Sequence, residues 1–175
     1  MRPAKDGLQP QSTPIARRTI AIDARASVWL HPPMPDSRIP VLLYDGECGL
    51  CNAVVRFILR HDREGKVHFA PLQSVPGQEY LRAMGLPEDD FDSLVFVPDW
   101  GRKDKDGYRL RTSGALAAFA SMGGPWAVFS RLSAVPTWIR DPVYKLISKT
   151  RYAVFGEYEL RPLENPDWEK RFLAR

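Results

Sequence analysis

Two cysteines, Cys48 and Cys51, are the only cysteines of the 175-residue chain, and two residues separate them. A disulfide between them would close a loop of only a few residues, so the pair cannot crosslink distant segments of a domain. The spacing instead suits thiol-disulfide exchange, in which one thiolate attacks a disulfide and a second thiol resolves the product. The C-x-x-C motif therefore indicates a redox-active dithiol.

The residues around this motif predict a strand, a loop and a helix. Residues 41–44 form a short apolar run, and residues 45–47 are typical of a turn. A helix that ends by Gly65 is expected next, because apolar residues recur at helical spacing at Leu50, Val54, Phe57 and Ile58. The N–H groups and dipole of a helix N-terminus favour a thiolate on Cys48. We therefore expect Cys48 to attack and Cys51, one turn later, to resolve the mixed disulfide.

Two carboxylates, Asp45 and Glu47, stand close to the first cysteine. A nearby negative charge disfavours a thiolate, so neither residue is expected to stabilise one. Two functional roles are open for Asp45, as a proton acceptor for a cysteine or as a group that orients the loop. The structural alternative is that Asp45 caps the helix or the turn through its side chain. Glu47 is expected to be an exposed loop carboxylate.

Zinc binding is the competing chemistry, because His61 and His68 could complete a set of four ligands with the cysteines. His61 would lie about three turns along the helix from Cys48, too far for one ion with bonds near 2.0–2.3 Å. We therefore expect no metal and no organic cofactor. An inert pair of small core thiols is a further alternative.

The rest of the chain predicts an α/β fold. Further elements are expected at residues 67–70 (strand), 78–84 (helix), 92–97 and 108–111 (a hairpin), and 115–120, 126–132 and 138–151 (helices). Ser113 is expected to cap the helix at 115–120. The order of strand, helix, strand, helix, strand, strand, helix is that of the thioredoxin fold. We therefore expect a thioredoxin-like domain, with a small mixed sheet flanked by helices and extra C-terminal helices.

Composition divides the chain into three parts. Residues 1–39 are predicted to form a flexible basic arm, since residues 1–40 hold seven of the sixteen prolines and six Lys/Arg against three Asp. Residues 40–156 are expected to form the thioredoxin-like domain with its C-terminal helices, and residues 157–175 a C-terminal tail. The net charge of +4 falls to +1 without the arm, which argues against a nucleic-acid partner.

The segment 126–151 is locally basic, with Asp141 as its one acidic residue and cations at Arg131, Arg140, Lys145, Lys149 and Arg151. Such a run is usually a solvated helix face, and otherwise marks an acidic partner or an anionic membrane surface. We expect no integral membrane segment, because no stretch reaches the roughly 18–20 apolar residues that a transmembrane helix needs. Peripheral membrane contact stays open. Arg17 and Arg18 interrupt any secretory signal, so we expect a cytoplasmic protein, or an organellar one if the arm is a transit peptide.

Residues 44–52, with the sequence YDGECGLCN, resemble the D-G-x-C-x-x-C signature of the DCC family of predicted thiol-disulfide oxidoreductases. The resemblance extends through later blocks at residues 69–74, 113–116, 136–144 and 151–156. It implies a thioredoxin-like fold, with Asp45, Cys48 and Cys51 as the motif residues. Thioredoxins place a cis-proline opposite the dithiol, and the matching position here is Asp92 or Ser93. This departure favours a small thiol or one dedicated partner over general reduction of protein disulfides.

The sequence thus predicts a thiol-disulfide oxidoreductase that exchanges disulfides through Cys48 and Cys51, with a disulfide-bearing protein or a small thiol as substrate. The alternative is a thioredoxin-like binding module, which docks a partner through its basic C-terminal helices and keeps a vestigial or redox-sensing dithiol. An accessible, readily alkylated Cys48 would favour the enzyme, and a buried, unreactive one the module.

Deletion of residues 1–38 is expected to leave the fold intact, because an arm rich in proline and charge buries little apolar area. The measurement is the thermal unfolding midpoint of the truncated chain against the full chain. A loss of several degrees would mean that the segment from Ile20 to Leu30 packs on the domain, as an additional N-terminal strand would.

Overall fold

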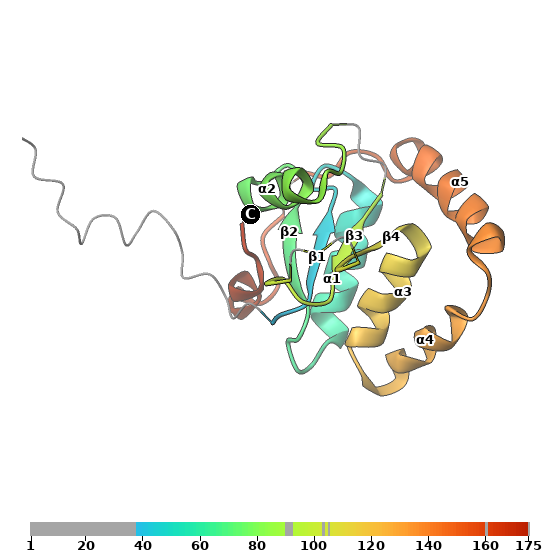
Figure 1. Ribbon diagram of the computed structural model, residues 1–175. Helices are drawn as coiled ribbons and strands as arrows, with labels where there is room; N and C mark the ends of the chain where they lie inside the picture. Colours follow the sequence, from blue (N-terminus) through green and yellow to red (C-terminus); the bar gives the residue numbers. More distant parts are fainter. Residues whose placement is uncertain (1–37, 90–92, 103, 105, 160, 175) are drawn as a thin grey trace, which may run out of the picture. The chain divides into compact units, whose positions relative to one another are not determined.

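The computed structural model describes residues 38–89, 93–102, 104, 106–159 and 161–174 (Figure 1). Residues 1–37 of the predicted arm, and Asp92, lie outside this range. The described strands are β1 (Val41–Tyr44), β2 (His68–Pro71), β3 (Val95–Val97) and β4 (Arg109–Leu110). The α-helices are α1 (Gly49–His61), α2 (Val75–Met84), α3 (Arg111–Ser121), α4 (Phe129–Leu132) and α5 (Thr137–Phe155), and the 3-10 helices are η2 (Gly124–Val128) and η3 (Pro166–Arg171).

The four strands form one mixed sheet in the order β2-β1-β3-β4. β1 pairs in parallel with β2, with Val41 opposite His68, and antiparallel with β3, with Val41 opposite Val97. β3 and β4 form the expected antiparallel pair. A parallel β-α-β unit joined to a hairpin in this order is consistent with a thioredoxin-like fold, as predicted.

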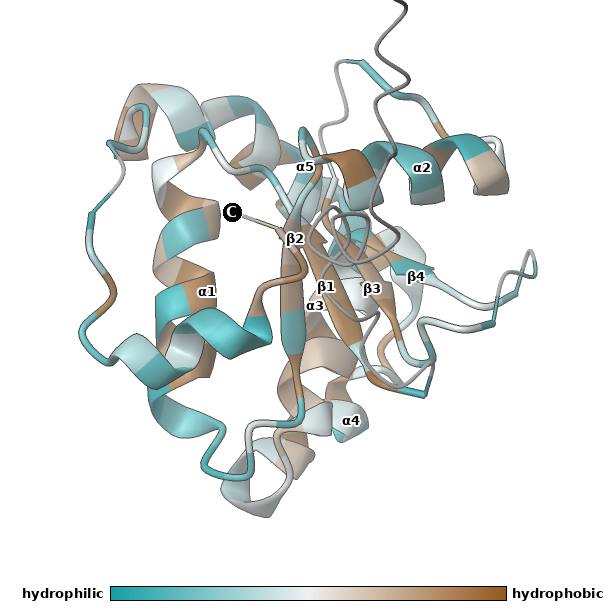
Figure 2. Ribbon diagram, turned by 90° about the vertical axis from the view of Figure 1, so that its left-hand side faces the viewer, coloured by the Kyte–Doolittle hydropathy of each residue, from teal (hydrophilic) through white to brown (hydrophobic). Residues whose placement is uncertain are grey.

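Each face of the sheet packs against its own set of helices, because successive side chains of a strand point to opposite faces. Leu42 and Tyr44 of β1 belong to the core cluster that contains residues of α1 and α3. Val41 and Leu43 belong to a second cluster, with residues of α2. Figures 1 and 2 show α1 and α3 on one side of the sheet and α2 on the other, with the hydrophobic strands β1 and β3 between them. Burial on both faces explains why β1 is apolar throughout.

Local signals account for most helix boundaries. The helix after the motif ends at His61, before the predicted stop at Gly65, where the backbone turns with φ of +63°. α2 begins at Val75 rather than at Gln78, because the Ser74 hydroxyl accepts a hydrogen bond from the Gly77 N–H and caps the helix. No described helix is long and apolar enough to cross a membrane.

The prediction that Ser113 caps the third helix is wrong. α3 begins at Arg111, and its N-cap residue, Leu110, makes no side-chain capping bond. β4 runs directly into the helix, because Arg111 adopts a left-handed φ of 50° and its N–H donates to the Ser93 hydroxyl at 3.0 Å. Ser113 is therefore already inside the first helical turn.

The segment after α5 packs against the domain. Phe172 forms an isolated parallel bridge with Phe69 of β2, and the Leu173 N–H donates to the Phe69 carbonyl at 2.9 Å. The buried Arg171 guanidinium lies 2.6 Å from an Asp62 carboxylate oxygen and also donates to the Val67 carbonyl. This ion pair joins the end of α1 to the C-terminal segment.

Arg171→Met is expected to destabilise the protein by about 3–5 kcal/mol, because the buried Asp62 carboxylate would lose its countercharge. The measurement is the free energy of unfolding in urea. Lys170→Met is the matched control, since Lys170 neighbours Arg171 and pairs with Asp167 in solvent. Equal unfolding midpoints for the two variants would contradict an anchoring role for Arg171.

Candidate dithiol site

The two cysteines lie at the N-terminus of α1, as the sequence predicted. Cys48 is the N-cap residue, and its sulfur accepts a hydrogen bond from the Cys51 N–H at 3.4 Å. Both residues are free cysteines in the structure. An N–H group and the positive end of the helix dipole therefore face the Cys48 sulfur.

A backbone segment at residues 155–158 covers this helix end, and Cys48 has 0% of its surface exposed. The Gly49 N–H donates to the Gly156 carbonyl at 3.1 Å, and the Tyr158 N–H donates to the Glu47 carbonyl at 2.7 Å. A Cβ atom on Gly49 would lie 2.4 Å from the Phe155 carbonyl oxygen, so this close approach requires glycine between the cysteines. Access to the Cys48 sulfur therefore requires the segment to move.

Cys51 is the more accessible of the two cysteines and lines a cavity of about 220 Å³. The cavity is mainly apolar and lies between α1, α3 and α5, with a lining that includes Leu50, Val54, Phe119, Tyr144, Ile147 and Arg151. Burial and, to a smaller extent, the neighbouring Cys48 raise the pKa of Cys51 to about 12, while the Arg151 charge acts in the opposite direction. At neutral pH the Cys51 side chain is a thiol.

Asp45 is buried, and its carboxylate accepts four hydrogen bonds. One oxygen accepts from the Glu47 N–H at 3.1 Å and from the Gln73 amide at 2.9 Å. The other accepts from the Arg151 guanidinium at 2.9 Å and from the Tyr152 hydroxyl. Asp45 thus caps the turn before the cysteines, one of the expected roles, while Cys48 rather than Asp45 caps the helix. Burial and the bond to Asp45 raise the pKa of Tyr152, so its hydroxyl keeps the donated proton.

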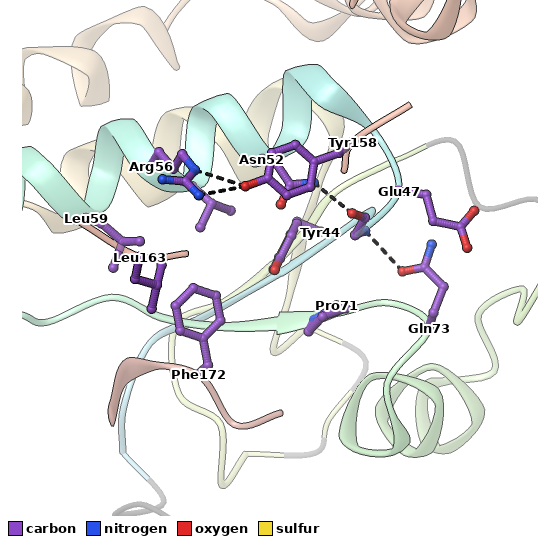
Figure 3. Close-up of a pocket in the computed structure, with 12 residues that line it drawn as sticks. Tyr44, Glu47, Asn52, Arg56, Leu59, Pro71, Gln73, Tyr158, Leu163 and Phe172 are labelled. Carbon is purple, nitrogen blue, oxygen red and sulfur yellow. Dashed lines mark hydrogen bonds between the residues drawn. The ribbon is translucent and has the colours of Figure 1, made fainter. Parts of the chain in front are cut away.

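Two amide side chains hold the loop between Asp45 and Cys48. The Asn52 amide donates to the Gly46 carbonyl at 2.8 Å and to the Cys48 carbonyl at 3.0 Å. The Gln73 side chain accepts from the Gly46 N–H at 3.1 Å. Both side chains line a second cavity, of about 170 Å³, in which Arg56 binds the Tyr158 hydroxyl (Figure 3). The loop is therefore fixed from α1 and from the end of β2.

The family model of the DCC1-like thiol-disulfide oxidoreductases matches residues 42–157, which include the motif, α5 and the covering segment as far as Glu157. The chain belongs to this family. It is 42% identical over 142 residues to uncharacterized protein YuxK of Bacillus subtilis (strain 168), an alignment that covers 80% of this chain and 99% of YuxK. A DCC family protein of Arabidopsis thaliana, named as chloroplastic, is 31% identical over 121 residues, 69% of this chain and 67% of its own length. No solved structure matches the chain.

Four residues outside the D-G-x-C-x-x-C motif complete the site, namely Asn52, Gln73, Arg151 and Tyr152. Arg151 ends the basic run at 126–151, and both Arg151 and Tyr152 belong to the later DCC block at 151–156. Neither residue was linked to Asp45 by the sequence. Asn52 and Gln73 lay in the stretches 44–52 and 69–74 that resemble the DCC family, without a predicted contact with the loop. Membership in the DCC family supports a redox role for the chain in general.

The histidines considered as zinc ligands lie away from the dithiol. His61 is at the far end of α1 and stacks on Phe57, and the His68 ring bonds the Lys66 carbonyl. Among the described residues, no three His, Cys, Asp or Glu side chains are grouped as metal ligands would be. Ser93 is one of the two candidates for the position of the thioredoxin cis-proline. Its hydroxyl accepts a hydrogen bond from the Arg111 N–H.

Asp45→Asn is expected to lower the pKa of Cys51, because the Asp45 charge is one of the influences that raise it. The measurement is the pH dependence of thiolate absorbance, with Cys48→Ser in both proteins so that one thiol titrates. The midpoint should move to lower pH when Asp45 is replaced. Glu47→Gln is the matched control, since that neighbouring carboxylate is exposed and is expected to leave the midpoint in place. A midpoint that Asp45→Asn leaves unchanged would contradict this coupling.

Proposed function

We propose that this protein is a thiol-disulfide oxidoreductase that exchanges disulfides through Cys48 and Cys51. The observation that carries the proposal is the position of the Cys48 sulfur as N-cap of α1, where it accepts the Cys51 N–H. The dithiol chemistry itself requires no metal and no organic cofactor. The family name supports this class of reaction.

The reaction proceeds in two exchanges. The Cys48 thiolate attacks one sulfur of a substrate disulfide, forms a mixed disulfide with it, and releases the other substrate sulfur as a thiolate. The Cys51 thiol then loses its proton and attacks the Cys48 sulfur, which releases the second substrate thiolate and leaves a Cys48–Cys51 disulfide. The raised pKa of Cys51 supports this order, because Cys51 is a poor first nucleophile at neutral pH.

Asp45 acts in this proposal as a positioning residue. The four hydrogen bonds occupy the acceptor positions of its carboxylate, and they come from the loop, the turn after β2 and α5. The contacts therefore support the orienting role over the role of proton acceptor. The positive charge of Arg151 favours the Cys51 thiolate that the second exchange requires.

The substrate in this proposal is a small thiol compound or one dedicated disulfide-bearing protein. Cys48 is reached when the covering segment at residues 155–158 separates from the motif loop, a movement that breaks the two backbone hydrogen bonds at Gly49 and Tyr158. A cytoplasmic location would keep the dithiol reduced. The chloroplastic name of the plant relative makes an organellar location the competing one.

The complete burial of Cys48 favours a second candidate, a thioredoxin-like binding module with a redox-sensing or vestigial dithiol. The basic helices α4 and α5 would then bind a partner. The two candidates differ in the reactivity of Cys48 at neutral pH, which is rapid in the enzyme and negligible in the module.

Cys51→Ser is expected to accumulate a mixed disulfide with an added disulfide reagent, whereas Cys48→Ser is expected to accumulate none at neutral pH. The first variant keeps the attacking sulfur and lacks the resolving one. The measurement is the intact mass of each variant after incubation with oxidised glutathione and with an aromatic disulfide.

The opposite trapping pattern would reverse the assigned roles of the two cysteines. If neither variant traps a reagent while a thioredoxin treated alongside does, the binding module is the correct reading. Alkylation of Cys48 in the Cys51→Ser variant gives an independent measure, since a module with a closed cover reacts slowly with any reagent.

A further inference from the structure

One row of polar side chains on helix α5 faces the domain. Arg151 binds Asp45, the Tyr144 hydroxyl accepts the Leu94 N–H at 3.1 Å, and Ser148 is buried beside them. Asp141 accepts a hydrogen bond from Thr112 of α3. These positions recur every three or four residues and therefore form one face of the helix.

The opposite side of the helix is apolar and exposed. This α5 apolar face consists of Trp138, Ile139, Val143, Leu146, Ile147 and Val154. Trp138 is 75% exposed, Leu146 65% and Val154 68%. Figure 1 shows α5 at the periphery of the fold, with no other labelled element beyond it. Contiguous exposed apolar residues of this kind mark an interaction surface.

The charges around this face are mainly positive. Lys145 and Lys149 are exposed on α5. The one acidic residue of α5, Asp141, is held by Thr112 and lies 3.9 Å from Arg111. Acidic side chains at Glu157 and Glu159 follow only after the helix has ended. The face therefore suits an anionic partner.

This charge argues against two occupants from the chain itself. A second copy would bring Lys145 and Lys149 towards an equally basic surface. Residues 1–40 carry six Lys/Arg against three Asp, so this segment is basic as well. Both occupants would place like charges together around the apolar contact.

We propose that the α5 apolar face docks on an anionic lipid bilayer, with α5 parallel to the membrane surface. A helix with large apolar side chains on one face and lysines at its margin is the pattern of an interfacial helix. From Trp138 to Val154 the row spans about 24 Å at 1.5 Å per residue, and an indole near its start suits the headgroup region. A fluid bilayer accepts such a row of side chains without a matching groove, which a protein partner would have to provide.

Docking brings the dithiol site close to the membrane. The polar face of α5 holds Asp45 through Arg151, so roughly one helix diameter, about 10 Å, separates the motif loop from the lipid surface. The apolar cavity beside Cys51 is lined by Ile147, which belongs to the docking face. The proposal concerns the outer face of the helix and holds whether or not the dithiol exchanges disulfides.

The test is flotation of the full-length protein with vesicles of phosphatidylcholine, or of phosphatidylcholine and phosphatidylglycerol in equal parts. We expect the protein to bind the anionic vesicles, and we expect this binding to weaken as the salt concentration is raised. Leu146→Gln should lower the partition coefficient about tenfold, because it removes a large side chain from the lipid contact. Val75→Gln is the matched control, since Val75 is 71% exposed on α2, and should leave binding unchanged.

Replacement of Lys145 and Lys149 by Gln should weaken binding to anionic vesicles about fivefold per lysine. Absence of binding to the anionic vesicles would overturn the proposal, as would equal loss in the Leu146→Gln and Val75→Gln variants. A dimer in solution that Leu146→Gln dissociates would assign the face to a second copy instead. If the full chain does not bind the vesicles and a chain without residues 1–37 does, the α5 apolar face would be assigned to the arm.

Discussion

The buried ion pair between Asp45 and Arg151 is the interaction on which the candidate site depends. It joins the loop before the cysteines to a helix 106 residues later in the sequence, at a distance of 2.9 Å. Removing one partner of such a pair leaves an uncompensated buried charge, which typically costs about 3–5 kcal/mol. The position of α5 and the conformation of the motif loop are therefore coupled.

This coupling explains the geometry around the dithiol. Once Arg151 holds the end of α5 against Asp45, the chain that leaves the helix passes over the N-terminus of α1. Gly156 and Tyr158 then form backbone hydrogen bonds with the motif loop, and Cys48 is buried beneath them. The same anchoring turns the polar side of α5 inwards and leaves its apolar side exposed. The contact between Asp45 and Arg151 thus accounts both for the segment that covers Cys48 and for the outward direction of the α5 apolar face.

The local elements were largely predictable from the sequence. The apolar run at 41–44 has the same bounds as β1, and the cysteines start a helix, because these features depend on neighbouring residues. The start of α3 was not predictable in this way. The Arg111 N–H donates to the hydroxyl of Ser93, which lies 18 residues earlier in the chain. The early start of α2 was obscured by Pro76 and Gly77, which the first turn of a helix tolerates better than its interior.

The sequence by itself determined a dithiol at a helix N-terminus and the order of a thioredoxin-like fold, because spacing, periodicity and capping act over a few residues. The tertiary structure alone decided the partners of Asp45, the burial of Cys48 and the direction in which α5 presents its apolar side. Each of these depends on contacts between segments about 100 residues apart. A linear pattern of polar and apolar residues defines two faces of a helix, and the buried ion pair selects which of them faces the domain.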